Sequence, residues 1–284
     1  MGSFPGVIRA GRLPLDIEVF PCLRDHRFGG TAVFPAAEAM QVLAAAVRET
    51  APRTDVLTIR DARFDKFLDI PADTPRLAAF SDIEPLSGGR VKAALVTRHR
   101  ASRTGITREK LHVFMVFGGS TPADETEAVQ LADLPGNGVD IPARALYADM
   151  VPFGPAYHNI QDRVRLWPTR AEATVLAARH PTPAGPLGSP FPLDAAFHAA
   201  CAWGQRYARV VAFPVGLDCR RILRPTRTGE SYRAVVAPRR TAPDLLVFDL
   251  ALYGLDGALY ETALGVRMRD VSAGRMKPPP WVLA

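Results

Sequence analysis

Apolar residues recur along the chain with two different periods, and the change from one period to the other predicts where helices and strands lie. Within Pro35–Val47 they return at helical spacing and form one stripe suited to burial. Pro35 suits the first helical position, where a missing N–H costs no hydrogen bond. The range Pro192–Gln205 predicts a second alanine-rich helix, again with a proline at its start.

Strands are predicted by runs in which apolar residues alternate with polar ones, as in a sheet with one wet face. In the first half these runs are Leu15–Phe20, Val56–Arg60, Arg76–Ile83, Arg90–Arg98 and Lys110–Phe117. In the second half they are Gln161–Pro168, Arg170–Ala177, Ser231–Pro238, Leu245–Tyr253 and Leu259–Val271. Between the last two runs, Leu255–Ala258 contains Asp-Gly and predicts a hairpin turn.

The order of elements occurs twice, with one long helix followed by several antiparallel strands, and this favours an α+β fold. Glycine, proline and acidic residues cluster between the two halves and interrupt any strand or helix. We therefore expect subdomains at residues 1–118 and 142–284, joined by a linker at residues 119–141. The halves show no convincing sequence repeat.

The first candidate for chemistry is His26, in the segment from Asp25 to Pro35. It directly follows a predicted strand, and Gly30 lies in the tight approach to the first helix. A carbonyl group placed near the positive end of that helix would be polarised, and an imidazole could then remove a proton from the neighbouring carbon. The alternative is a histidine that only satisfies backbone groups in a turn.

The second candidate is Asp194 with His198, four residues apart and therefore on one face of the second helix. Buried among apolar residues, Asp194 should be partly protonated and able to donate to a leaving hydroxyl, with His198 holding its orientation. The alternative is a carboxylate that caps the helix. A third motif, from Phe153 to His158, is by itself only a turn with aromatic anchors.

Together the three motifs resemble the dehydratase domains of modular and iterative polyketide synthases. That family carries HxxxGxxxxP, then YGPxF, then DxxxQ or DxxxH. The corresponding residues here, in the same order and at the same spacings, are His26, Gly30 and Pro35, then Phe153, Gly154, Pro155, Ala156 and Tyr157, then Asp194 and His198. The stretch Phe213–Asp218 is also similar to the one that follows the family's second helix.

The resemblance implies a double hotdog fold, in which two antiparallel sheets each wrap around a central helix. It implies an enzyme, a hydro-lyase, with His26 as base and Asp194 as acid facing each other across a channel. His198, Gly30, Pro35 and Tyr157 would support this pair, and Phe153, Gly154, Pro155 and His158 would line the substrate pocket. The substrate, a β-hydroxyacyl thioester, would arrive on the phosphopantetheine of an acyl carrier protein, among other polyketide synthase components. No metal or other cofactor is implied, and dimerisation is common in the family.

One departure leaves the reaction outcome open. The family often has a glycine and a tyrosine before YGP, where this chain has Met150–Phe153. A tyrosine hydroxyl would then have to come from Tyr147 or Tyr157. The stretch Leu146–Val151 is also similar to product-template domains, which steer cyclisation with the same histidine and aspartate. The alternatives to dehydration are therefore a cyclase, a double-bond isomerase, or a non-catalytic scaffold.

Composition narrows the classes of function that remain open. Hydrophobic residues make up 48% of the 284 residues, which is ordinary for a globular protein. The formal net charge of +6 comes from basic residues scattered among acidic ones, a pattern that argues against nucleic acid and fits an acidic protein partner better. Three cysteines without CxxC spacing indicate free thiols and disfavour zinc. Without an apolar run long enough for a membrane span, or a signal peptide, we expect a cytoplasmic protein.

Overall fold

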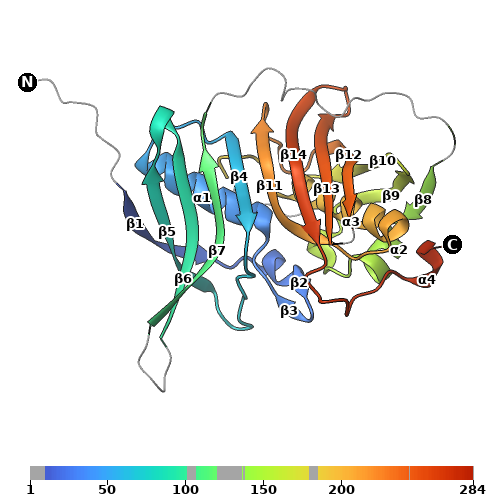
Figure 1. The fold of residues 1–284 in the computed structure, drawn as a ribbon, viewed down its shortest axis with the longest axis horizontal. Helices are drawn as coiled ribbons and strands as arrows, with labels where there is room; N and C mark the ends of the chain where they lie inside the picture. The colour runs from blue at the N-terminus through green and yellow to red at the C-terminus, as the bar shows by residue number, and fades with distance from the viewer. Residues whose placement is uncertain are drawn as a thin grey trace, which may run out of the picture.

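A twelve-stranded antiparallel sheet dominates the computed structural model, which describes residues 10–100, 107–119, 136, 138–178, 185–242 and 244–283. The strand order is β1-β5-β6-β7-β4-β11-β14-β13-β12-β10-β9-β8. The first five strands come from the first half of the chain and the other seven from the second (Figure 1). A separate hairpin is formed by β2 and β3.

In the first half, the strands are β1 Gly11–Glu18, β2 Arg27–Phe28, β3 Thr31–Ala32, β4 Thr58–Phe64, β5 Arg76–Pro85, β6 Val91–Arg100 and β7 Thr107–Phe117. In the second half, they are β8 Val139–Pro142, β9 Ile160–Trp167, β10 Arg170–Leu176, β11 Phe213–Ile222, β12 Ser231–Ala242, β13 Leu245–Gly254 and β14 Leu259–Arg269. The helices are α1 Ala36–Thr50, α2 Ala143–Ala145, α3 Phe191–Trp203 and α4 Pro280–Leu283. Two π-helical turns, Leu146–Met150 and Gly204–Ala208, continue α2 and α3.

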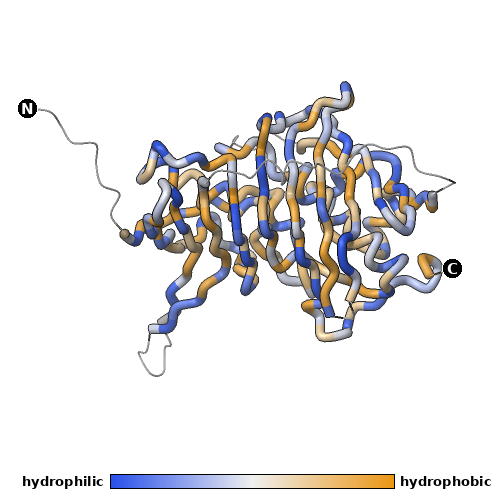
Figure 2. The backbone as a smooth tube through the Cα atoms, turned by 45° about the horizontal axis from the view of Figure 1, so that its top comes forward, coloured by the Kyte–Doolittle hydropathy of each residue, from blue (hydrophilic) through white to orange (hydrophobic). Residues whose placement is uncertain are grey.

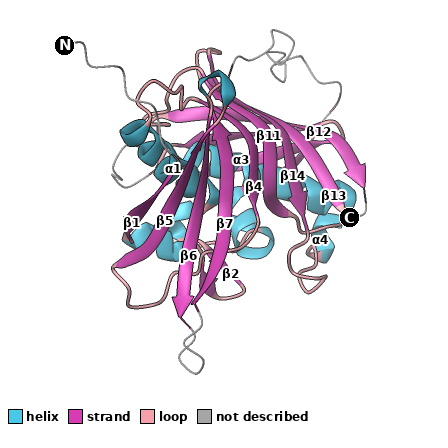
Figure 3. Cartoon of the chain, turned by 60° about the vertical axis from the view of Figure 1, so that its left-hand side comes forward, coloured by secondary structure: helices cyan, strands magenta, loops and turns pink. Residues whose placement is uncertain are grey.

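The sheet curves around the two long helices, α1 and α3, and this confirms the double hotdog expectation (Figure 3). The two half-sheets are not separate, because β4 pairs antiparallel with β11 and joins them edge to edge. Along the strands, hydrophobic and hydrophilic segments alternate (Figure 2). This alternation is the pattern from which most of the strands were predicted.

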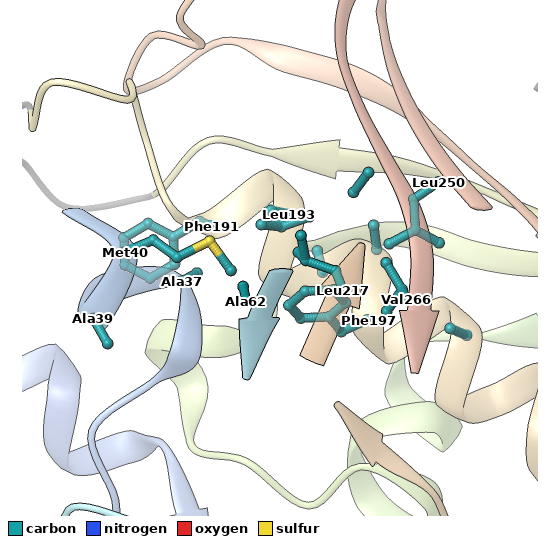
Figure 4. Packing of buried hydrophobic residues seen from close by; sticks show 14 of the residues in the cluster. Ala37, Ala39, Met40, Ala62, Phe191, Leu193, Phe197, Leu217, Leu250 and Val266 are labelled. Atoms are coloured by element: carbon teal, nitrogen blue, oxygen red, sulfur yellow. The ribbon is translucent and has the colours of Figure 1, made fainter. Parts of the chain in front are cut away.

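The helix α3 is buried on every side, whereas α1 buries one face and exposes Ala45, Arg48 and Glu49. Figure 4 shows Met40 of α1 and Phe191 of α3 packed close together, with Leu217 of β11 in the same core. A helix that is apolar all round belongs inside a protein, which explains the alanine-rich composition of α3. One hydrophobic core therefore spans both halves of the chain.

Among the differences from the sequence-based expectation, three concern the first helix, the central sheet and the linker. Pro35 is the N-cap of α1 and not its first helical residue. The strand β11 was not predicted, and β8 begins at Val139, inside the range expected for the linker. Most of that linker lies outside the described residues, so the division into subdomains stays a prediction.

A buried ion pair on two second-half strands lies next to the join between the halves. The Arg220 guanidinium of β11 donates to both carboxylate oxygens of Glu261 on β14, at 2.7 and 3.0 Å. Both side chains are buried, and Arg220 also lies 3.3 Å from the Met40 sulfur on α1. The pair therefore ties the central strands to the helix of the first half.

Breaking this ion pair should lower the stability of the fold. We expect Glu261→Gln to lower the free energy of unfolding by about 3 to 5 kcal/mol, because it leaves a buried guanidinium without its counter-charge. Glu84→Gln, in the exposed pair with Lys92, should cost less than about 1 kcal/mol. Urea denaturation of both variants checks the difference, and equal losses would contradict it.

A second link between the halves lies just before α3. The Gln41 side chain of α1 donates to Gly188 O at 2.5 Å and accepts from the Leu187 N–H at 3.0 Å. Gly185 fits against it only without a side chain, since an added Cβ would lie 2.1 Å from Gln41 Oε1. The start of α3 is thereby held against α1.

Candidate active site

His26 lies at the end of a 3-10 turn, Pro21–Asp25, directly before β2. Its Nδ1 is 3.0 Å from the carbonyl oxygen of Val33. A carbonyl can only accept, so Nδ1 carries the hydrogen and Nε2 keeps a free lone pair. Burial lowers the pKa of His26 below its ordinary value, although the nearby charge of Asp194 opposes this effect. Nε2 is therefore suited to act as a base.

Asp194 lies in the first turn of α3 and meets His26 across the boundary between the halves. Its Oδ1 is 3.9 Å from His26 Nε2, and its Oδ2 is 3.0 Å from His198 Nε2. The start of α3 has no side-chain capping hydrogen bond, so the carboxylate does not serve as a helix cap. The structure thus brings together the three residues that the sequence motifs single out.

The protonation of Asp194 differs from the sequence-based expectation. Burial by itself would raise the pKa of this carboxyl group, but the contacts with His198 and then His26 hold it below its usual range. The expectation of a partly protonated Asp194 is therefore wrong for the resting protein. The sequence predicts the apolar surroundings, which raise the pKa of Asp194. The two imidazoles near the carboxylate lower this pKa by more.

The turn from Phe153 to His158 supports His26 from one side. The Phe153 ring lies 4.4 Å from the imidazole, and the Tyr157 ring meets it edge-on at 5.0 Å. The Tyr157 hydroxyl is buried and has no hydrogen-bond partner among the described residues. Burial, with Glu38 and Asp194 nearby, raises its pKa well above the ordinary value. Tyr157 therefore packs against the base without bonding to it.

Asp25 fixes this turn, a role that the sequence reasoning missed. Its carbonyl accepts from the Gly154 N–H at 2.7 Å, and its Oδ2 accepts from the Ala156 N–H at 2.9 Å. A Cβ on Gly154 would lie 2.5 Å from Asp25 Cγ, so only glycine permits the approach. The position of Asp25 directly before His26 was the available signal.

A cavity of about 210 Å³ opens beside the pair. Its walls are mostly apolar and come from both halves, with Phe34, Ala36, Phe64, Phe67, Leu68, Leu95, Val113, Val151, Phe153, Phe197, Ala212, Phe213, Val215, Met268 and Val271 among them. Of the four residues predicted to line the pocket, Phe153 borders this cavity. Gly154, Pro155 and His158 are not among the described residues of its wall. Instead, His158 Nε2 lies 2.8 Å from Phe153 O, and the His158 ring stacks on the Tyr147 ring.

Gly30 and Pro35 occupy different places from those expected. Gly30 is exposed in the β2–β3 turn, with a left-handed backbone (φ 85°), and does not border the cavity. Pro35 is buried, and the residue after it, Ala36, reaches the cavity wall. The start of α1 therefore reaches the cavity, with its free backbone N–H groups, whereas the turn around Gly30 does not.

His112 of β7, which the sequence analysis did not single out, also borders the cavity. Its Nε2 lies 2.8 Å from Thr97 Oγ1, and its Nδ1 lies 3.2 Å from Lys66 O and 3.1 Å from Phe67 O. His112 thereby holds the loop after β4 against the cavity. Burial lowers its pKa, which favours the neutral ring.

Glu38, in the first turn of α1, has a pKa raised to about 7 by burial and by the charge of Asp194. A carboxyl group with a raised folded-state pKa destabilises the fold once it must ionise. Stability is therefore fully present below the unfolded pKa near 4.5 and declines as the pH rises to about 7. We expect Glu38→Gln to raise the free energy of unfolding at pH 8 by up to about 3 kcal/mol, and to change little at pH 4.5.

Denaturation at the two pH values measures this effect. The matched control is Glu49→Gln, which removes an exposed carboxylate from the same helix and should change stability by less than about 0.5 kcal/mol. An equal gain in both variants would contradict the assignment.

Within the described part of the chain, no group of three or more His, Cys, Asp or Glu side chains is placed to hold a metal ion. Among the described residues, Cys22, Cys201 and Cys219 form no disulfide. None of the helices that the structure describes is long and apolar enough to cross a membrane.

The family models and the solved structures that match this chain agree with one another. Residues 132–278 match the family model "polyketide synthase dehydratase N-terminal domain", and residues 12–92 match "polyketide synthase dehydratase domain". Among solved structures, a dehydratase domain of a mycocerosic acid synthase-like polyketide synthase is similar with TM-score 0.70 and 17% identity, over 94% of this chain and 93% of the other. None of the curated proteins matches this chain.

Two further structures extend this comparison. A trans-AT polyketide synthase dehydratase domain from Brevibacillus brevis has TM-score 0.70 and 17% identity, over 92% of this chain and 93% of the other. A trans-acyltransferase polyketide synthase enoyl-isomerase has TM-score 0.66 and 13% identity, over 90% and 98%. At these identities the structural likeness shows the fold.

Proposed function

Because this chain belongs to the polyketide synthase dehydratase family, we propose that it removes water from a β-hydroxyacyl thioester and yields an α,β-unsaturated thioester. The observation that carries the proposal is the 3.9 Å approach of His26 Nε2 to Asp194 Oδ1 beside an apolar cavity. A base and an acid at this separation can address the α-carbon and the β-hydroxyl of one bound chain.

His26 begins the proposed reaction. Its unprotonated Nε2 removes the α-proton, and the electron pair of that C–H bond forms the new double bond. N–H groups in the first turn of α1 are suited to stabilise the negative charge that develops on the thioester oxygen. The packing of Phe153 and Tyr157 around His26 keeps the imidazole in place.

Asp194 completes the reaction as the acid. Its Oδ1 gives a proton to the β-hydroxyl, the C–O bond breaks, and water leaves with the bonding pair. The reacting form therefore holds one proton on the His26–Asp194 pair, and that proton lies on Asp194. After turnover the proton lies on His26 and Asp194 is a carboxylate, so return of that proton from His26 to Asp194 restores the reacting form.

The thioester is proposed to arrive on the phosphopantetheine arm of an acyl carrier protein. The apolar cavity suits an acyl chain, and the net charge of +6 favours an acidic partner. Only protons are transferred in the proposed steps, so they need no metal, flavin or nicotinamide.

The test is incubation with a 3-hydroxyacyl chain on a carrier protein, followed by mass spectrometry of the intact carrier. Loss of one water from the acyl chain is expected. Unchanged substrate across a panel of chain lengths and both hydroxyl configurations would refute the proposal.

A second candidate is an isomerase, favoured by the similarity of the fold to an enoyl-isomerase. The same His26 could move a proton between the α- and γ-carbons of an unsaturated chain. NMR of the product separates the two, because dehydration of the 3-hydroxyacyl chain places the double bond at the α,β position. A cyclase would instead join two carbons of a longer polyketide chain.

A further inference from the structure

The turn from Phe153 to Tyr157 belongs to the second half of the chain, yet its two aromatic rings pack on His26 of the first half. The ring centroids of Phe153 and Tyr157 lie 4.4 and 5.0 Å from that of the imidazole. Both rings are buried and apolar toward the imidazole, so they contribute to the burial that lowers the pKa of His26. The surroundings of the base therefore depend on the other half of the chain.

The same two rings also contact α3, the helix that carries Asp194. The Phe153 ring lies 5.1 Å from the His198 ring, and the Tyr157 ring lies 5.4 Å from the Phe191 ring. The turn thus contacts both the imidazole and the helix of the acid. Its position contributes to the distance between the base and the acid.

Hydrogen bonds within the turn set its shape. The Tyr157 N–H donates to Gly154 O at 3.0 Å, and Asn159 Nδ2 donates to Ala156 O at 3.0 Å. All four of these residues belong to the second half of the chain. These bonds therefore fix the shape of the turn but not its distance from His26.

Asp25 supplies bonds between the turn and the first half. Its carbonyl oxygen accepts from the Gly154 N–H at 2.7 Å, and its Oδ2 accepts from the Ala156 N–H at 2.9 Å. Asp25 directly precedes His26 in the chain. A turn that moves away from Asp25 therefore moves away from the imidazole as well.

We propose that Asp25 is a positioning residue that sets the distance between His26 and Asp194 by holding the turn Phe153–Tyr157 beside the imidazole. The proposal rests on the proposed dehydration. Asp25 is not among the described residues that border the cavity, so it acts through the turn and not on the substrate. Without its side chain the turn is held less firmly, water reaches the imidazole, and the base and the acid lose their alignment.

Activity of two variants at this position tests the role. We expect Asp25→Ala to lower kcat by about tenfold to a hundredfold, because a displacement of about 1 Å can cost this much. Asp25→Asn should keep kcat within about threefold of the wild type, since its amide oxygen can still accept from the Ala156 N–H. An equal loss in the two variants, or no loss in either, would overturn the proposal.

The matched control is Asp55→Ala. The Asp55 side chain also accepts from a backbone N–H, that of Leu57, at 3.0 Å, and Asp55 is not among the described residues of the cavity wall. This variant should lose some thermal stability and keep the wild-type kcat. A loss of kcat like that of Asp25→Ala would show that any missing aspartate acceptor disturbs the site, and would overturn the proposal.

Gly154→Ala disturbs the same contact from the other side. The backbone of Gly154 (φ −74°) suits alanine, but the added Cβ would lie 2.5 Å from Asp25 Cγ and push the turn away. We expect a lowered kcat. Because both substitutions displace one turn, the double variant with Asp25→Ala should lose less than the product of the two single losses. Losses that multiply would show that the two residues act separately and would overturn the proposal.

Titration of His26 by NMR gives a readout that needs no substrate. The titratable groups that face the imidazole are Asp194 and His198 on α3 and Tyr157 in the turn. Burial lowers the pKa of His26 most, the charge of Asp194 raises it, and His198 lowers it. When water reaches the ring in Asp25→Ala, the pKa of His26 should therefore rise toward its ordinary value of 6.5.

Asp25→Asn is the reference for this titration, because both variants remove the same charge and only Asp25→Ala removes the acceptor. The pKa of His26 should stay at its wild-type value in Asp25→Asn. An unchanged pKa of His26 in a folded Asp25→Ala variant would overturn the proposal. Since the titration does not depend on turnover, it separates a failure of the positioning argument from a failure of the proposed dehydration.

Discussion

Replacing His26 by alanine is expected to lower kcat/KM for dehydration by roughly a thousandfold, since a positioned general base supplies about 10²- to 10⁴-fold of the rate. Among the described residues, the imidazole is the group placed to remove the α-proton beside Asp194, and its Nε2 lone pair is fixed by the Val33 carbonyl at Nδ1. Steady-state assays with a 3-hydroxyacyl thioester measure the loss.

His99→Ala is the matched control, because His99 is an exposed histidine on β6. It should keep the wild-type rate. Circular dichroism and thermal unfolding of His26→Ala should show a folded protein, so that the loss can be assigned to chemistry. A folded His26→Ala variant with near wild-type activity would refute the role of the base.

Replacing Asp194 by asparagine is expected to lower kcat/KM by roughly 10³- to 10⁴-fold. Asparagine has nearly the same shape and can still accept from His198, but its amide is not an acid and gives no proton to the β-hydroxyl. Activity and its pH dependence are measured together. For the wild-type protein a bell-shaped profile is expected, because the reacting pair must hold one proton and not two or none.

The control for this substitution is Asp218→Asn, which changes an exposed carboxylate on β11 and should leave the rate unchanged. Retention of the bell-shaped profile and rate in Asp194→Asn would exclude Asp194 as the acid.

Much of the fold could be predicted because local patterns agree with the final packing. The apolar stripe along α1 indicates a helix with one buried face. The alternation of apolar and polar residues indicates the same for the strands β5, β6 and β13. The strand β11 gave no such signal. It begins Phe-Pro, shifts register near Gly216, and buries Arg220 in mid-strand, where a charged residue normally indicates solvent. Its partner Glu261 lies far along the chain, and sequence spacing does not show such pairing.

Part of the candidate site could likewise be predicted from the sequence, and part could not. His26, Asp194 and His198 were found because their spacings form motifs, and the structure brings them together. Other features of the site depend on contacts between distant segments. These are the distance between the halves, the loop held by His112 and the hydrogen bonds from the turn at Gly154 to Asp25. The charge of Asp194 was predicted wrongly for a related reason. Local composition shows an apolar helix, whereas His26 approaches from the other half of the chain.

Intact-protein mass spectrometry of a single turnover tests the central claim most directly. A carrier protein loaded with a 3-hydroxyacyl chain is mixed with excess wild-type protein, His26→Ala or Asp194→Asn. We predict that the wild-type protein yields an acyl chain lighter by one water, and that both variants leave the chain unchanged on the same timescale. Dehydration by either variant at the wild-type rate would contradict the account.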